Sequence, residues 1–508
     1  MRELLVRDCS IGGKAGYNVY CQGGKIVRIE ESGAVSSDVE VIDANGGSLC
    51  SGFTDSHCHP FEYGWLKRNV DLRGTTSMTA VRLRVTAGIQ RAKPGEWVSG
   101  MGWDQEDFPG KRMPTRAQLD DISPENPIVL SRICGHIGLL NTRSIEVLGL
   151  RGRTGEEYER DQDGVLTGIV KERALEEVYE NLPRSAEISA ADLQSVESEA
   201  GRLGLTTLHC VVSRDSFQEE LEALVSLAAS GSLSLNYRVY VPPEALDYID
   251  ATGLGQKLAG TNVRINGVKI YADGSLGART AALREPYADD PSNTGILRYT
   301  DEQLSELVKV VDSKGMQAIV HAIGDRAVEQ AAEALGGIAG GSNPRRHRIE
   351  HASLLPKDLR SKMTRHSIRA TVQPLFIVSD FWAVDRLGEE RVRDLYPLKS
   401  MLSEGIVASG SSDSPIESMS PILGMWAAMV RRGDNSPEEL TLEQAQTLYT
   451  VNARSNGFDP LEGLSEGAPA DLTLLDSDIS GLHPALFRKV GVLATIVGGK
   501  AVHSYGSA

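Results

Sequence analysis

The 508-residue chain has no apolar run close to the ~18 residues that a membrane span requires. Its first residues, Met1 to Asp8, carry charges where a secretion signal would need an apolar segment. The six cysteines are dispersed without a C-x-x-C pair, which is typical of free thiols in a reducing compartment. A formal net charge of −16 argues against nucleic acid and membrane surfaces as partners, because both repel an acidic protein. These absences predict a soluble, cytoplasmic protein.

Both ends of the chain are rich in short strand-like segments, and Gly23-Gly24 is typical of a hairpin between two of them. The segments are Leu4–Val6, Tyr17–Cys21, Lys25–Glu30 and Val39–Asp43 near the start, and Asp471–Leu475, Val492–Val497 and Ala501–His503 near the end. We expect residues 1–50 and 460–508 to form one small β-sandwich domain.

The middle of the chain, residues 51–459, alternates strand-like and helix-like segments, which is the pattern of βα units and a parallel sheet. The eight candidate strands are Ser51–Asp55, Thr206–Val211, Tyr237–Val241, Val263–Tyr271, Gln317–Ala322, Arg348–Ala352, Ala370–Gln373 and Ile406–Ser411. Eight such units predict an α/β fold of the (β/α)8 TIM-barrel type. Its active site would lie at the C-terminal ends of the strands.

The first and second strands are separated by roughly 150 residues, too many for one βα loop. This stretch contains an aromatic and glycine-rich segment from Trp97 to Pro114 and an apolar run from Ile128 to Cys134. We expect an inserted subdomain over residues 62–200 that lies over the barrel mouth and contacts substrate. A structural elaboration away from the site is the alternative.

Two histidines one residue apart, His57 and His59, follow the first candidate strand. Side chains at i and i+2 of a strand share a face, so both imidazoles would point the same way. Imidazole is the commonest protein ligand for zinc and related metals, so the pair would supply half of a metal site. A His-x-His pair alone is also common on protein surfaces, and further ligands are needed to decide.

Lys269 lies near the end of an otherwise apolar strand, where a buried ammonium is costly without a partner. Carboxylation of its amine by carbon dioxide would give an anionic carbamate that can bridge two cations. An ion pair with Asp273, or exposure at the strand end, would also explain the lysine.

Three more ligand-type residues, His321, His351 and Asp413, each end a strand-like run. Asp413 alone could be a helix cap. Together with the earlier residues, however, they lie on strands one, four, five, six and eight of one predicted barrel, so a chance arrangement is improbable.

At these residues the chain resembles the amidohydrolase superfamily, and within it the YtcJ-like branch (amidohydrolase family 3), which includes N-substituted formamide deformylases. The resemblance runs along nearly the whole chain. It includes Gly52–His59, Lys269–Leu283, His321–Asp325, Ile349–Ala352, Ser412–Pro415 and Ala470–Leu472.

The resemblance implies a metal-dependent hydrolase of non-peptide carbon–nitrogen bonds in a small molecule, such as an amide, N-acyl or N-formyl compound. His57, His59 and Asp413 would hold one divalent metal, and His321 and His351 the other. A carboxylated Lys269 and a hydroxide would bridge the two metals, and Asp413 would move the proton to the leaving nitrogen. Zinc is expected first, with manganese, iron, cobalt or nickel as alternatives.

Substrate contacts are predicted for Trp103, Asp104, His136, Asp273 and Arg279, by location and by similarity to the family. His136 could equally be a structural histidine, and the Asp273-Gly274 pair a plain turn. A homodimer would suit such a protein, although no sequence feature decides it.

Two other functions compete with this interpretation. A one-metal aminohydrolase that deaminates a heterocycle would leave Lys269 uncarboxylated. A non-enzymatic binding protein on the same scaffold would not need all six ligand-type residues, which this chain retains.

Overall fold

The computed structural model describes residues 3–31, 39–132, 137–183, 185–431 and 436–505. The chain forms two compact units. The larger contains Met1–Phe61 and Leu193–Ala508, and the smaller contains Glu62–Asp192. Two helices, α1 (Pro60–Arg68) and α6 (Ala186–Arg202), run across the two boundaries.

The larger unit contains an eight-stranded sheet in which every neighbouring pair of strands is parallel. Its strands, in spatial order, are β6 (Phe53–Cys58), β13 (Leu205–Val211), β14 (Asn236–Val241), β15 (Val263–Tyr271), β16 (Gln317–Ala322), β17 (Arg348–His351), β18 (Arg369–Val372) and β19 (Ala408–Gly410). Hydrogen bonds from the residues after β19 to β6 join the two edge strands. The predicted (β/α)8 barrel is therefore confirmed.

Helices separate the barrel strands from β13 onward and also follow the last one, β19, as the sequence pattern predicts. They are α7 (Phe217–Ala229), α8 (Leu246–Thr252), α9 (Leu254–Lys257), α10 (Asp301–Ser313), α11 (Asp325–Ala339), α12 (Lys357–Arg365), α13 (Phe376–Ser379), α14 (Ala383–Arg391), α15 (Leu398–Ser403), α16 (Pro421–Val430), α17 (Leu442–Tyr449) and α18 (Val451–Asn456). In α10, Thr300 and Gln303 form a capping box at the N-terminus, and Leu304, Val308 and Val311 form its buried face.

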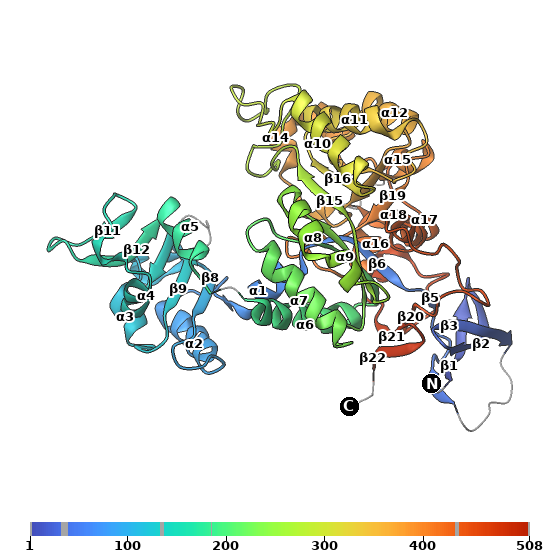
Figure 1. The fold of residues 1–508 in the computed structure, drawn as a ribbon, viewed down its shortest axis with the longest axis horizontal. Coiled ribbons are helices and arrows are strands. Elements are labelled where there is room, and N and C mark those ends of the chain that lie inside the picture. The colour runs from blue at the N-terminus through green and yellow to red at the C-terminus, as the bar shows by residue number, and fades with distance from the viewer. Residues whose placement is uncertain (1–2, 32–38, 133–136, 184, 432–435, 506–508) are drawn as a thin grey trace. The chain divides into compact units, whose positions relative to one another are not determined.

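Strands from both ends of the chain build the β domain, where the first (blue) and last (red) segments lie side by side (Figure 1). One sheet has the order β3 (Lys25–Glu31), β2 (Lys14–Gln22), β1 (Leu4–Ile11), β4 (Glu40–Asp43). The other has the order β22 (Lys500–Ser504), β21 (Val492–Val497), β20 (Leu472–Leu475), β5 (Leu49–Ser51). Apolar residues of both sheets form one core cluster, and α19 (Pro484–Phe487) lies between β20 and β21 in the chain.

The first barrel strand begins later than its sequence suggested. Ser51 belongs to β5, which pairs with β20 of the β domain, and the barrel strand starts at Phe53. Gly52 lies between the two strands, and a Cβ there would come within 2.3 Å of the Thr206 side chain. The chain therefore passes from one sheet to the other at a residue where only glycine fits against β13.

The smaller unit has its own six-stranded sheet, with the order β11 (Tyr158–Arg160), β12 (Leu166–Lys171), β10 (Ile137–Leu140), β9 (Ile128–Arg132), β8 (Val98–Trp103), β7 (Val70–Asp71). Its helices include α2 (Met78–Ile89), α3 (Arg116–Asp120), α4 (Thr142–Val147) and α5 (Arg173–Glu180). Alternate residues of β9 enter two different apolar clusters, with Ile128 and Leu130 in one and Val129 in the other. Both faces of this sheet are therefore covered.

Across the described part of the chain, no helix combines the length and apolar character that crossing a bilayer would require.

Candidate metal centre

Five strands of the barrel carry the six predicted ligands at or just beyond their C-terminal ends. The ligands are His57 in β6, His59 after it, Lys269 in β15, His321 in β16, His351 in β17 and Asp413 after β19. Because all eight strands are parallel, these ends meet at one rim of the barrel.

Hydrogen bonds between the first strand and the last loop bring His57 and Asp413 together. The Asp55 carboxylate accepts hydrogen bonds from Ser412, at 3.0 Å from the backbone N–H and 2.5 Å from the hydroxyl. The backbone N–H of Asp413 donates to the carbonyl of His57 at 2.8 Å. These contacts fix the position of the Asp413 side chain over the end of β6.

One carboxylate oxygen of Asp413 faces both histidines of the first strand. Asp413 Oδ1 lies 3.3 Å from His57 Nε2 and 3.4 Å from His59 Nε2. Ligand atoms of His57, His351 and Asp413 all lie within 4.8 Å of one another, a spacing at which they could hold one metal ion.

The remaining predicted ligands adjoin this group. The rings of His351 and His321 are 4.5 Å apart, centroid to centroid, and those of His57 and His351 are 5.2 Å apart. Lys269 Nζ lies 3.0 Å from His57 Nε2. The structure therefore brings all six residues together at the rim.

Three of the histidines are oriented by a second contact on the nitrogen that faces away from the group. His57 Nδ1 contacts the Glu350 carboxylate. His351 Nδ1 lies 2.8 Å from Gln373 Oε1, and His321 Nε2 lies 3.0 Å from the carbonyl of Gly274. Because these oxygens accept hydrogen bonds, each contacting nitrogen carries the hydrogen and the opposite nitrogen keeps a lone pair for a ligand.

The donor set fits a divalent metal. His321 Nδ1 is buried, and among the described residues it has no hydrogen-bond partner. A buried polar atom without a partner is costly, and a metal ion would satisfy this nitrogen. Imidazole nitrogen and carboxylate oxygen are ordinary zinc ligands, so the residues present match such an ion.

Two ligands with positive φ mark backbone strain at the rim. His351 has φ 71° and Asp413 has φ 55°, and Ala352 next to His351 has φ 43°. Such conformations are unfavourable for non-glycine residues and cluster at functional sites. In a regular strand His351 would face away from the side that Glu350 faces, so the turn of the backbone at His351 directs its ring to the rim.

Burial disfavours the protonated forms of His57, Lys269 and His351. It lowers the pKa of His57 to about 4, with a further contribution from the nearby Lys269, and it lowers the pKa of Lys269 to about 8. Burial also lowers the pKa of His351, and His321 adds to this effect. For Glu350, burial alone would raise the pKa, but Arg348 and His57 outweigh it and hold the carboxylate ionised.

The predicted substrate residues of the smaller unit have structural partners there. Trp103 is 1% exposed in an apolar core and donates its indole N–H to the carbonyl of Leu130 at 3.0 Å. Asp104 accepts from Arg132 at 2.8 Å and from the N–H of Glu106 at 3.0 Å. His136 lies outside the described residues.

The other two predicted substrate residues follow β15. Asp273 is buried, and its carboxylate accepts from the backbone N–H groups of Ala282, Ile323 and Gly324. Arg279 is part of an ion pair with Asp289 at 2.8 Å. Asp273 adjoins the rim residues, because its Oδ1 lies 3.4 Å from His321 Nε2.

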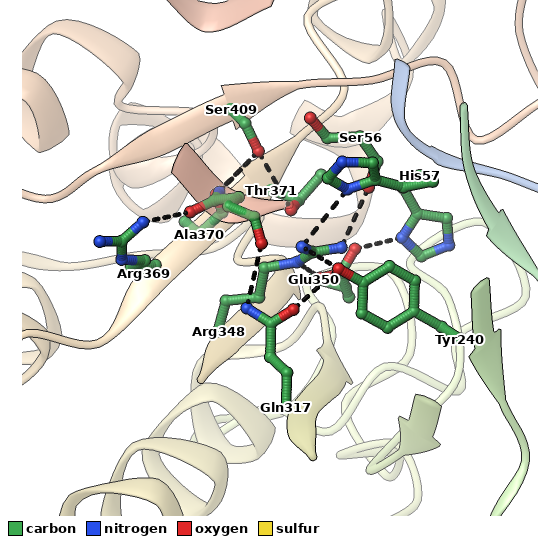
Figure 2. A network of polar contacts seen from close by, with 12 residues as sticks. Ser56, His57, Tyr240, Gln317, Arg348, Glu350, Arg369, Ala370, Thr371 and Ser409 are labelled. Carbon is green, nitrogen blue, oxygen red and sulfur yellow. Dashed lines mark hydrogen bonds and ion pairs between the residues drawn. The ribbon is translucent and has the colours of Figure 1, made fainter. Parts of the chain in front are cut away.

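Sequence reasoning missed Glu350, Arg348, Gln373 and Asp55. A signal for two of them was present, because Arg348 and Glu350 are charged residues at alternate positions of a strand that is buried throughout. Figure 2 shows both in the barrel interior, in a polar network with His57 and Tyr240.

Comparison with known proteins agrees with this geometry. A model of the amidohydrolase family matches residues 40–503. This chain belongs to the amidohydrolase family. A Bacillus subtilis (strain 168) protein named YtcJ is 31% identical over 489 residues, which cover 92% of this chain and 91% of that protein. The resemblance stated from the sequence is thereby confirmed.

Two further relatives are named as hydrolytic enzymes. The N-substituted formamide deformylase of Arthrobacter pascens is 25% identical over 536 residues, which cover 98% of this chain and 98% of that protein. The crystal structure of an uncharacterized metal-dependent hydrolase from Pyrococcus furiosus matches 95% of this chain and 100% of its own, with 32% identity and a TM-score of 0.80. Family and neighbours together support a hydrolase.

Proposed function

We propose that this protein hydrolyses a non-peptide carbon–nitrogen bond of a small molecule, an amide, N-acyl or N-formyl compound, with two divalent metal ions. The observation that carries the proposal is the convergence of four histidines, a lysine and an aspartate at one end of the barrel, with a buried His321 nitrogen left for a ligand. The deformylase relative supports the choice of bond.

We assign the ligands to two subsites. His57, His59 and Asp413 would hold one ion, and His321 and His351 the other. Ions bound there would lower the pKa of a water molecule and polarise the substrate carbonyl.

Lys269 would join the two subsites as a carbamate. The amine must be neutral to react with carbon dioxide, and at a pKa of about 8 roughly a tenth of it is neutral at pH 7. Its nitrogen forms a bond to the carbon of carbon dioxide and loses a proton, so a cationic group becomes an anionic one. An anionic group at this position would suit the two divalent ions proposed for the site.

Asp413 would move the proton that hydrolysis requires. Its carboxylate stays ionised. Burial alone would raise the pKa of Asp413, but the hydrogen bond with His59 and the adjacent His351 and His57 outweigh burial and leave the pKa below its usual value. It can therefore accept a proton from the attacking water while the carbon–oxygen bond forms. Passing that proton to the nitrogen lets the carbon–nitrogen bond break, since an amide nitrogen leaves poorly without it.

Metal analysis of purified protein, followed by a screen of N-acyl and N-formyl amines, tests the proposal. We expect about two ions per chain and release of a free amine from at least one compound class. A single ion per chain together with ammonia release from a heterocycle would replace the proposal with a one-metal deaminase. Absence of bound metal after incubation with zinc, manganese, cobalt and nickel would refute both.

A further inference from the structure

Arg348 and Glu350 are charged residues in the barrel interior to which the proposed reaction gives no task. Both side chains are fully buried. Burying an ion pair costs desolvation energy, and such a pair is weak evidence of stabilisation by itself. Their presence beneath the rim therefore calls for another explanation.

The two oxygens of Glu350 face two different cationic or donor groups. Oε1 accepts from Arg348 Nε at 2.5 Å, while Oε2 contacts His57 Nδ1. A carboxylate only accepts, so His57 carries its hydrogen on Nδ1. The lone pair of His57 Nε2 then faces the rim, where Asp413 Oδ1 lies 3.3 Å away.

Arg348 is held on the side opposite Glu350 as well. Its Nη2 donates to the carbonyl of Ser56 at 3.1 Å, and its Nη1 donates to the hydroxyl of Tyr240 at 3.0 Å (Figure 2). Ser56 directly precedes His57, so one guanidinium contacts both the strand that carries His57 and the carboxylate that holds its ring. The whole arrangement is buried and has little freedom to move.

We infer that Glu350 is a positioning residue for His57, held in place by Arg348, and that this pair strengthens metal binding at the subsite of His57, His59 and Asp413. The inference rests on the proposed function, since it assumes that His57 binds metal. A carboxylate on the outer nitrogen fixes the tautomer of a ligating histidine and makes its other nitrogen more basic. On His351 the corresponding partner is the neutral Gln373 Oε1, and on His321 it is the Gly274 carbonyl at 3.0 Å, with the Asp273 carboxylate farther away at 3.4 Å.

Titration of metal-free protein with cobalt(II), followed by visible absorption, tests the inference without any substrate. In Glu350→Gln we expect the apparent affinity for an ion at this subsite to fall about 10–100-fold and the cobalt spectrum to change. This variant also leaves the Arg348 guanidinium buried without its counter-charge, which lowers stability.

The double variant Glu350→Gln/Arg348→Met removes that unpaired charge. We expect its melting temperature to recover toward that of the wild type while cobalt affinity stays low. Thr371→Val is the matched control, because Thr371 is buried, pairs with Glu350 across β17 and β18, and contacts Ser409 rather than a rim residue. It should bind cobalt as the wild type does.

The outcomes separate the two proposals. A wild-type protein that binds no divalent ion would overturn the metal site and the role of Glu350 together. Tight binding by the wild type, with unchanged affinity and spectrum in Glu350→Gln and in the double variant, would overturn the role of Glu350 alone.

Discussion

The amine of Lys269 lies 3.0 Å from Nε2 of His57. This is the nitrogen that keeps a lone pair, because Glu350 contacts the other ring nitrogen, Nδ1. Lysine and imidazole therefore face the same point of the rim although they come from β15 and β6, on different parts of the barrel. This relationship makes Lys269 the first residue to test.

Replacing Lys269 with alanine should remove the group that joins the two subsites. We expect the metal content to fall from about two ions per chain to one or fewer, with activity lost, because a carbamate can no longer form. Elemental analysis and a hydrolysis assay measure both effects. A short-chain carboxylate added to the variant should restore part of each, since it supplies the missing oxygens.

Lys314→Ala is the control for this variant, because Lys314 is paired with Asp250 at the surface. It should retain wild-type metal content. Two tightly bound ions and full activity in Lys269→Ala would contradict the bridging role.

Asp413→Asn should reduce turnover more than it reduces metal content. The amide keeps one ligand oxygen but cannot take a proton from water, so we expect kcat to fall by about 10²–10⁴. Steady-state kinetics with parallel elemental analysis separates the two effects. Asp358→Asn, at an exposed carboxylate on α12, is the control, and an Asp413→Asn enzyme with wild-type kcat would exclude proton transfer by Asp413.

Asp273→Ala should destabilise the barrel. Three backbone N–H groups, from Ala282, Ile323 and Gly324, would lose their common acceptor in a buried setting. At about 1–3 kcal/mol for each of the three unsatisfied buried donors, we expect a loss of about 3 kcal/mol or more in the free energy of unfolding. Urea unfolding measures it, and an unchanged midpoint would show that Asp273 has no structural role.

Glu220 on α7 should make stability depend on pH in the mildly acidic range. Burial raises the pKa of this carboxyl from its ordinary value of 4.5 to about 7 in the folded protein. The folded state therefore holds the proton more tightly. The contribution of Glu220 to the free energy of unfolding is fully present below the pKa of the unfolded state, and it is lost as pH rises toward 7.

We expect the free energy of unfolding of the wild type, relative to Glu220→Gln, to fall between pH 5 and 7 by up to about 1.4 kcal/mol per pH unit. The glutamine is uncharged and keeps an acceptor for the Ser213 N–H, which lies 3.0 Å from the carboxylate. Parallel slopes for the two proteins in this range would contradict the prediction.

Much of the fold was predictable from the sequence because local patterns carry it. Each of the eight barrel strands is a short apolar or alternating run, and all eight occur near the predicted positions. The main difference is at the start of the first strand, where the close approach of Gly52 to Thr206 separates β5 from β6. This approach could not be predicted from local sequence, because Thr206 belongs to β13, which is distant in the chain.

The sequence by itself also determined which residues could serve as ligands, since a histidine or aspartate at a strand end is visible without coordinates. Tertiary structure alone decided what orients them. The contact of Glu350 with His57 and the hydrogen bonds from Ser412 to Asp55 each join segments that meet only when the barrel closes. Hydrogen bonds depend on distance and direction in space, and neither can be read from spacing along a chain.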